Sequence, residues 1–141
     1  MGKADLEFNT QPVPAARPRV FRNGGVAYPK AHTEYKEYLK RVLRDHKANP
    51  YDGLIEVRFL FVMPPYKGSP YPTHRSDLDN LAKLPMDCLT QSENFWVDDS
   101  LIVSLIALKR FARAGETPHT KVRITHIDGD IGEYTDKVFL Q

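Results

Sequence analysis

The sequence predicts a small α/β (α+β-like) domain, in which two principal helices pack on a mixed β-sheet beside an N-terminal β-hairpin. Three stretches carry this prediction: an amphipathic helical pattern at 31–48, alternating apolar residues at 55–63, and a long apolar run at 101–111. A chain of 141 residues is long enough to bury a core and fits one domain. We therefore expect a single domain over 1–141, with flexible tails at 1–5 and 130–141.

The first half of the chain contains a hairpin and a helix. Residues 23–25, Asn-Gly-Gly, form a turn signal between two short extended stretches, after a short strand near 6–8. In 31–48 the apolar residues recur at helical spacing, at Tyr35, Tyr38, Leu39, Val42 and Leu43. Thr33 is the expected N-cap of this helix, whose other face is basic.

The second half contains the remaining elements of the sheet. Residues 55–63 alternate as a strand with one buried face, and a proline-rich loop follows at 64–72. A second helix is predicted over 78–89, with a kink at Pro85. The apolar run at 101–111 predicts a strand in the centre of the sheet. A last strand is expected over 122–127.

Composition and charge restrict the class of protein. No apolar run is long enough to cross a bilayer, the first ten residues are not a signal peptide, and one cysteine, Cys88, excludes a disulfide framework. These features favour a cytoplasmic protein. Residues 14–50 hold nine basic and three acidic residues, whereas 76–100 hold six acidic residues and Lys83 alone. This asymmetry suits a protein that binds a polyanion beside a cation, although two solvated faces give the same pattern.

Asp77 and Asp79 are the first candidate site residues. Residues two apart share a face in extended chain but not in a helix, so the two carboxylates converge only where a helix begins. Ser76 or Asp77 as the N-cap gives that geometry. Asp79, Lys83 and Asp87 then follow at intervals of four along one helix face. A solvated helix cap is the alternative interpretation.

A second acidic pair, Asp98 and Asp99, stands just before the long apolar run. Packing of the intervening helix on the sheet is expected to bring the two acidic points within a few ångströms. Three converging carboxylates are suited to Mg²⁺, which prefers oxygen ligands and supports phosphodiester hydrolysis. A lysine beside them would neutralise charge on the reacting phosphate. A calcium loop is excluded, because the required glycine and terminal glutamate are missing.

These residues resemble the signature of the RusA-like Holliday junction resolvases, the crossover junction endodeoxyribonucleases. The matching segments are Asp77-Leu78-Asp79-Asn80-Leu81-x-Lys83, Asp87-x-Leu89, Phe95-Trp96-x-Asp98-Asp99-Ser100 and, near the N-terminus, Arg17-Pro18-Arg19 and Ala27-Tyr28-Pro29-Lys30. The resemblance covers about 11–127. It implies a homodimer that resolves four-way DNA junctions by paired symmetric cleavage with Mg²⁺, for which Mn²⁺ is a plausible substitute. It implies no membrane and no small-molecule cofactor.

Residue roles follow from the resemblance by position. Asp77, Asp79 and Asp99 match the metal-binding carboxylates and Lys83 matches the catalytic lysine, while the role of Asp98 stays open. The sequence departs from the family at Pro85 and by an extra residue near 92–94, and the proline puts the placement of Lys83 in question.

DNA contacts are expected from basic residues near the site: Arg17, Arg19, Arg22, Lys30 and Arg75. For Phe95 and Trp96, an aromatic wedge in DNA is one interpretation, and core packing of at least one is the favoured one. Two alternative functions remain open. One is a nuclease of the same fold acting on flaps or other branched DNA, and the other is a DNA-binding module that does not cleave.

Overall fold

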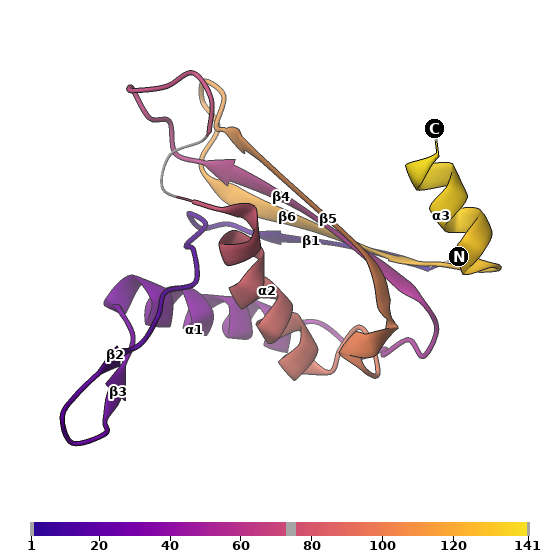
Figure 1. Ribbon diagram of the computed structural model, residues 1–141, viewed down its shortest axis with the longest axis horizontal. Coiled ribbons are helices and arrows are strands. Elements are labelled where there is room, and N and C mark those ends of the chain that lie inside the picture. The colour runs from indigo at the N-terminus through magenta and orange to yellow at the C-terminus, as the bar shows by residue number, and fades with distance from the viewer. Residues whose placement is uncertain (1, 73–75, 141) are drawn as a thin grey trace.

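The computed structural model describes residues 2–72 and 76–140, and shows one α+β domain (Figure 1). Its elements are β1 (Lys3–Phe8), β2 (Arg19–Val20), β3 (Val26–Ala27), α1 (Lys30–Arg44), β4 (Ile55–Met63), α2 (Leu78–Ser92), the 3₁₀ helix η1 (Asp99–Leu101), β5 (Ile102–Phe111), β6 (His119–His126) and α3 (Ile131–Phe139). The predicted hairpin, two principal helices and mixed sheet are confirmed. No helix in the described residues is long and apolar enough to span a bilayer.

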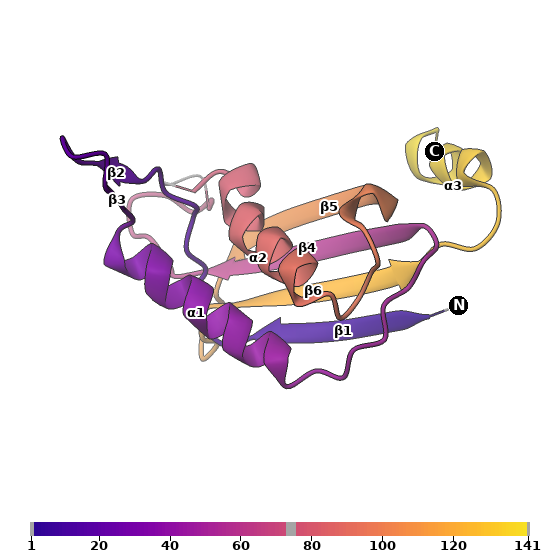
Figure 2. The same cartoon turned by 90° about the horizontal axis from the view of Figure 1, so that it is seen from below.

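The main sheet has four strands in the order β1-β6-β4-β5. β4 and β5 are parallel, whereas β6 runs antiparallel to both of its neighbours. Helices α1 and α2 lie on the same face of this sheet (Figure 2). The prediction that 101–111 is a central strand is wrong, because β5 lies at the edge of the sheet and exposes Val103, Leu105 and Leu108.

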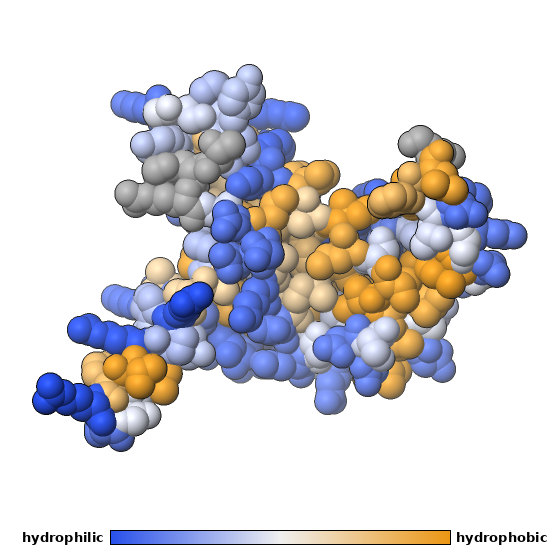
Figure 3. All heavy atoms as spheres, viewed as in Figure 1, coloured by the Kyte–Doolittle hydropathy of each residue, from blue (hydrophilic) through white to orange (hydrophobic). Residues whose placement is uncertain are grey.

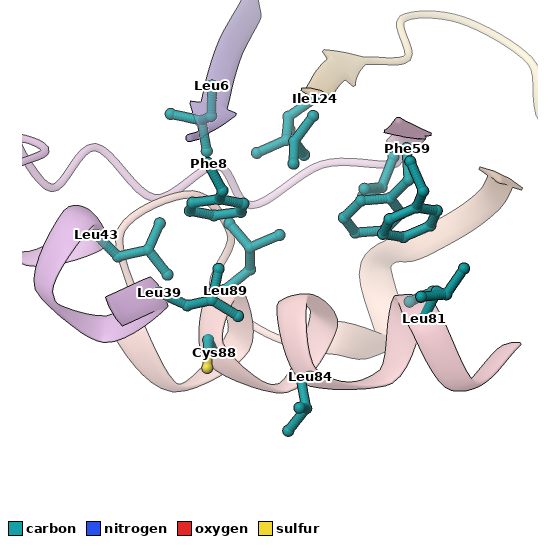
Figure 4. Packing of buried hydrophobic residues seen from close by; sticks show 14 of the residues in the cluster. Leu6, Phe8, Leu39, Leu43, Phe59, Leu81, Leu84, Cys88, Leu89 and Ile124 are labelled. Atoms are coloured by element: carbon teal, nitrogen blue, oxygen red, sulfur yellow. The ribbon is translucent and has the colours of Figure 1, made fainter. Parts of the chain in front are cut away.

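The core lies between the sheet and the two helices. Alternate residues of β4, among them Phe59 and Phe61, face this layer and are fully buried. Leu39 of α1 and Leu89 of α2 pack against the same cluster, together with Phe8 of β1 (Figure 4). The inward orientation of α1 is therefore confirmed. The predicted strand at β4 is confirmed as well, but its burial on one face alone is wrong, because Glu56 and Val62 on the other face are also buried.

Helix α1 begins at Lys30, with Pro29 rather than Thr33 as the N-cap, and ends at Arg44. Asn94 covers the C-terminal end of this helix, because its side-chain amide donates to the Leu43 carbonyl at 2.8 Å. The segment after α2 therefore has a structural role against α1.

Helix α2 continues through Pro85 to Ser92, three residues beyond its predicted end. Pro85 is buried and removes one backbone donor from the helix, but the helix is not interrupted there. Glu93, with φ of 57°, then ends the helix in the left-handed conformation.

The two ends of the chain also have regular structure. Residues 3–5 belong to β1, which pairs with β6, and residues 131–139 form α3, so regular structure reaches into both stretches for which the sequence predicts flexible tails, and their flexibility stays a prediction. The hairpin strands β2 and β3 form a two-stranded sheet of their own, separate from the main sheet. Figures 1 and 2 show this hairpin and α3 at opposite ends of the molecule.

Candidate active site

The N-terminus of α2 positions Asp77 and Asp79. Asp77 is the N-cap, with extended backbone angles of −80° and 144°, and its carbonyl accepts the Leu81 N–H at 3.0 Å. Its carboxylate makes no capping hydrogen bond with the first turn of the helix. Asp79 lies in that first turn, and both side chains are exposed. The predicted transition from extended chain to helix is confirmed, and the Asp77 carboxylate is not used as a cap.

The rest of α2 separates a buried face from a charged one. Its buried residues are Leu81, Ala82, Leu84, Pro85, Cys88 and Leu89. Asp79, Lys83 and Asp87 lie outside this buried set and are spaced by one turn. The apolar face thus fixes the direction in which Lys83 leaves the helix, as its spacing predicts.

Lys83 borders a cleft of about 280 Å³ between α1, α2 and the segment that precedes β2. Two hydrogen bonds hold that segment in place. The Ala15 N–H donates to the Asn80 carbonyl of α2 at 2.8 Å, and the Ala16 N–H donates to Nδ1 of His32 at 3.2 Å. The cleft is therefore built by three segments that are distant in the sequence.

His32 forms part of the wall of this cleft and is buried. Its ring stacks on Tyr28, with 4.4 Å between the ring centroids. Burial lowers the pKa of His32, and the neighbouring ammonium groups of Lys36 and Lys83 lower it further. The positive charge of the cleft therefore belongs to Lys36, Lys83 and Arg17, not to the histidine, and Asp87 adds one carboxylate to the same lining.

His32 and Lys36, which line this cleft, are not among the site residues predicted from the sequence. The available signal was helical spacing, because His32 lies three and seven residues before Tyr35 and Leu39 on the buried face of α1. His32 is in the first turn of α1, on its buried face, and there it meets the segment before β2 through Ala16.

Asp98 and Asp99 lie at the start of β5. The Asp98 carboxylate accepts the Ser100 N–H at 2.9 Å as the N-cap of η1. Hydrogen bonds from the backbone and side chain of Ser100 lower the pKa of Asp98. Asp99 is the first residue of η1, and both side chains are exposed. The local structure thus gives Asp98 a capping role.

The two acidic points lie at opposite ends of α2 (Figure 1). The helix has 15 residues and so a length of about 22 Å. Because β4 and β5 are parallel, the connecting helix runs back along them, and the Lys109 ammonium near the end of β5 donates to the Ser76 carbonyl. The expectation that Asp99 comes within a few ångströms of Asp77 and Asp79 in the same chain is wrong. Within the described residues, no three His, Cys, Asp or Glu side chains are grouped to hold a metal ion.

The predicted DNA-binding residues occupy the N-terminal hairpin and its surroundings. Arg17, Arg19 and Arg22 are exposed, and Lys30 begins α1, 3.6 Å from the Glu34 carboxylate. Arg75 lies outside the described residues. Among the aromatic residues, Trp96 is buried and Phe95 packs partly against the core, which confirms core packing.

A carboxylate pair beside a lysine, at a cleft with further cations, is an arrangement typical of enzymes that cleave phosphodiesters. The chain belongs to the RusA family, because the family model described as Endodeoxyribonuclease RusA matches residues 9–125 of its 141 residues. No curated protein matches the chain. The family consists of endodeoxyribonucleases of the Holliday junction resolvase type, which act on branched DNA and generally depend on a divalent metal. The chain is therefore an endodeoxyribonuclease, and α3 lies beyond the matched residues.

The lowered pKa of His32 predicts a pH dependence of folding stability. The folded state holds the ring neutral, whereas the unfolded chain takes up a proton near the usual pKa of 6.5, so stability should fall as the pH drops below that value. Urea unfolding at about pH 7.5 and about pH 5 measures the loss. The loss should be smaller in His32→Gln, and an equal loss in both proteins would contradict the assignment.

Proposed function

We propose that this protein is a Mg²⁺-dependent endonuclease that resolves four-way DNA junctions by paired, symmetric cleavage of two strands. The proposal is carried by one observation, the exposed Asp77 and Asp79 pair at the N-terminus of α2, close to the cleft that Lys83 borders. Family membership supports the substrate class. The ion and the symmetry of cleavage are the additional parts of the proposal, and Mn²⁺ is expected to substitute for Mg²⁺.

The carboxylate oxygens of Asp77 and Asp79 at the start of α2 are ligands that suit Mg²⁺. This ion takes oxygen ligands and is commonly held by one or two carboxylates together with waters and substrate phosphates. Asp77 and Asp79 are exposed, and the Asp77 carboxylate makes no capping bond in its helix. When bound, the ion supplies the charge that polarises the phosphodiester and lowers the pKa of the attacking water.

Lys83 and the basic residues would hold the DNA strand at this point. The Lys83 ammonium lies one turn from Asp79, where it would stabilise negative charge that grows on the phosphate oxygens during cleavage. Phosphate contacts without base specificity are assigned to Arg17, Arg19, Arg22, Lys30 and Arg75. Because burial lowers the pKa of His32, the positive charge in the cleft is assigned to the side chains of Arg17, Lys36 and Lys83.

The third carboxylate is assigned to a second copy of the chain. β5 is a ten-residue edge strand with exposed Val103, Leu105 and Leu108, and Figure 3 shows an apolar surface over this strand. A long apolar edge is a template for strand pairing, which proteins normally cover. Pairing β5 with the same strand of a second copy about a two-fold axis covers it.

Antiparallel pairing of the two β5 strands would also complete the metal site. The last part of β5 is bonded through Lys109 to Ser76, next to Asp77, whereas its first part follows Asp98 and Asp99. A two-fold axis at the middle of the strand exchanges these ends, so that Asp99 of one copy approaches Asp77 of the other. The dimer would then have two equivalent sites, which suits the approximate two-fold symmetry of a four-way junction. In this arrangement Asp98 holds the turn that presents Asp99.

Asp79→Asn should reduce cleavage of a four-way junction by a factor on the order of 100 or more, because a ligand that stabilises the transition state is lost. Junction binding should stay equal or become tighter, since one negative charge near phosphate is removed. Cleavage with Mg²⁺ and binding at the same ionic strength are measured on four-way, flap and linear duplex DNA. A normal cleavage rate would exclude Asp79 from the site.

Lys83→Ala should slow cleavage by a factor on the order of 100, because one positive charge next to the reacting phosphate is lost. The dissociation constant for the junction should change only a few-fold. Single-turnover cleavage and equilibrium binding separate the two effects. Lys137→Ala, in α3, is a control that removes one exposed cation elsewhere. Equal losses of rate and affinity would reduce Lys83 to a phosphate contact.

Mixing two inactive variants tests the shared metal site. Asp79→Asn and Asp99→Asn should each be inactive alone, but a mixed dimer keeps one site with both carboxylates intact. After subunit exchange, about a quarter of all sites should be active, and they should nick one strand rather than cut two. The nicks are resolved on denaturing gels. If activity does not return, Asp99 does not act across the dimer.

A further inference from the structure

The β2–β3 hairpin, residues 19–27, is an arm that extends from the body of the protein (Figures 1 and 2). Its turn is well defined by hydrogen bonds. The Phe21 N–H donates to the Gly25 carbonyl at 2.8 Å, and the Gly24 N–H donates to the Phe21 carbonyl at 3.0 Å. Gly24 has φ of 83°, which favours glycine at this position. The arm therefore has a fixed shape at its end.

Three apolar side chains of this arm face solvent. The exposed fractions are 70% for Val20, 47% for Phe21 and 57% for Val26. Figure 3 shows this apolar end with hydrophilic groups beside it. Single exposed apolar residues are common on proteins, but three on one narrow arm suggest that the arm enters an apolar environment when it binds.

The charge around these residues identifies that environment as nucleic acid. The chain has no acidic residue from 8 to 33, and this stretch contains Arg17, Arg19, Arg22 and Lys30. The guanidinium carbon of Arg19 lies 5.8 Å from the centroid of the Phe21 ring, so a cation is placed directly beside the apolar end. DNA offers the complementary arrangement, because its negatively charged phosphates lie outside the apolar faces of its stacked bases.

The arm is fixed relative to the candidate active site. Its base is held by the Ala15 bond to Asn80, the residue after Asp79, and by the Ala16 bond to His32. Five residues of extended chain from Ala16 to Phe21 span at most about 18 Å. With a rise of about 3.4 Å per base pair, the apolar end lies within about five base steps of Ala16, whose neighbour Ala15 is bonded to the residue after Asp79.

We propose that Val20 and Phe21 insert between bases at the branch point of the DNA, while the arginines of the arm hold the adjacent phosphates. This proposal rests on the proposed function. Insertion of an apolar wedge costs the stacking of the separated bases. At a branch point the continuous stacking of a duplex is already interrupted, so the cost is lower there than in linear DNA. The arm would thereby favour branched DNA and bring the strand beside it to the carboxylates.

The test uses a four-way junction with 2-aminopurine at the branch point, whose fluorescence rises when the base is unstacked. The protein carries Asp79→Asn, so that the junction is bound and not cut. We expect a several-fold rise on binding. With Val20→Ser and Phe21→Ser added, the rise should disappear, whereas affinity should change only a few-fold because every cation is kept. Phe139→Ser, at an 86% exposed aromatic residue of α3, is the matched control and should keep the rise.

The outcomes separate the two proposals. A fluorescence rise that survives the two serine substitutions, or junction binding by the Asp79→Asn protein without any rise, overturns the wedge and leaves the nuclease assignment intact. Failure of the protein to bind any branched DNA overturns both proposals. Loss of the rise only in the doubly substituted arm, with binding retained, supports the wedge. Both substituted residues are exposed, so circular dichroism should show an unchanged fold.

Discussion

The antiparallel packing of α2 along β5 determines where the acidic residues of the candidate site and Lys83 lie. The Lys109 ammonium holds the Ser76 carbonyl at the start of the helix, and the buried face of α2 fixes the rotation of the helix about its axis. The chain then returns to the beginning of β5 through Asp98. The two acidic points consequently lie at opposite ends of a helix that is about 22 Å long. Side-chain rotation cannot close such a gap.

The elements that depend on local pattern were predictable from the sequence, whereas their arrangement was not. α1, β4 and the hairpin follow from periodicity and turn residues, because each pattern is set by residues a few positions apart. β5 was placed wrongly in the centre of the sheet. A continuous apolar run indicates that other parts of a protein pack on both sides of a strand. It does not tell whether those parts belong to the same chain or to a second copy. An edge strand that pairs with a second copy has the same composition.

In the candidate site, too, the local geometry was predictable from the sequence, whereas the distances between distant residues were not. The position of Asp77 before the helix and of Asp79 in its first turn was predicted, because capping depends on neighbouring residues. The distance to Asp99 depends on the direction of α2, which follows from the parallel pairing of β4 and β5. A helix that connects two parallel strands must run back along them. The two acidic points therefore lie at opposite ends of the helix whenever the strands on either side of it are parallel, and strand direction is not encoded in local pattern.

On the proposed arrangement, selectivity for branched DNA arises from two requirements, a metal site completed by a second copy and the separation of stacked bases, neither of which is selective enough alone. One copy supplies two carboxylates, so a cation is held firmly only when a second copy adds the third. The base of each arm is bonded to Asn80, at the same end of α2 as Asp77, so each site of the dimer would have its own arm. A monomer on any DNA lacks the third ligand, and a dimer on linear duplex must separate stacked bases. Only a dimer on branched DNA meets both conditions, and it meets them at two sites together, which favours paired cleavage over single nicks.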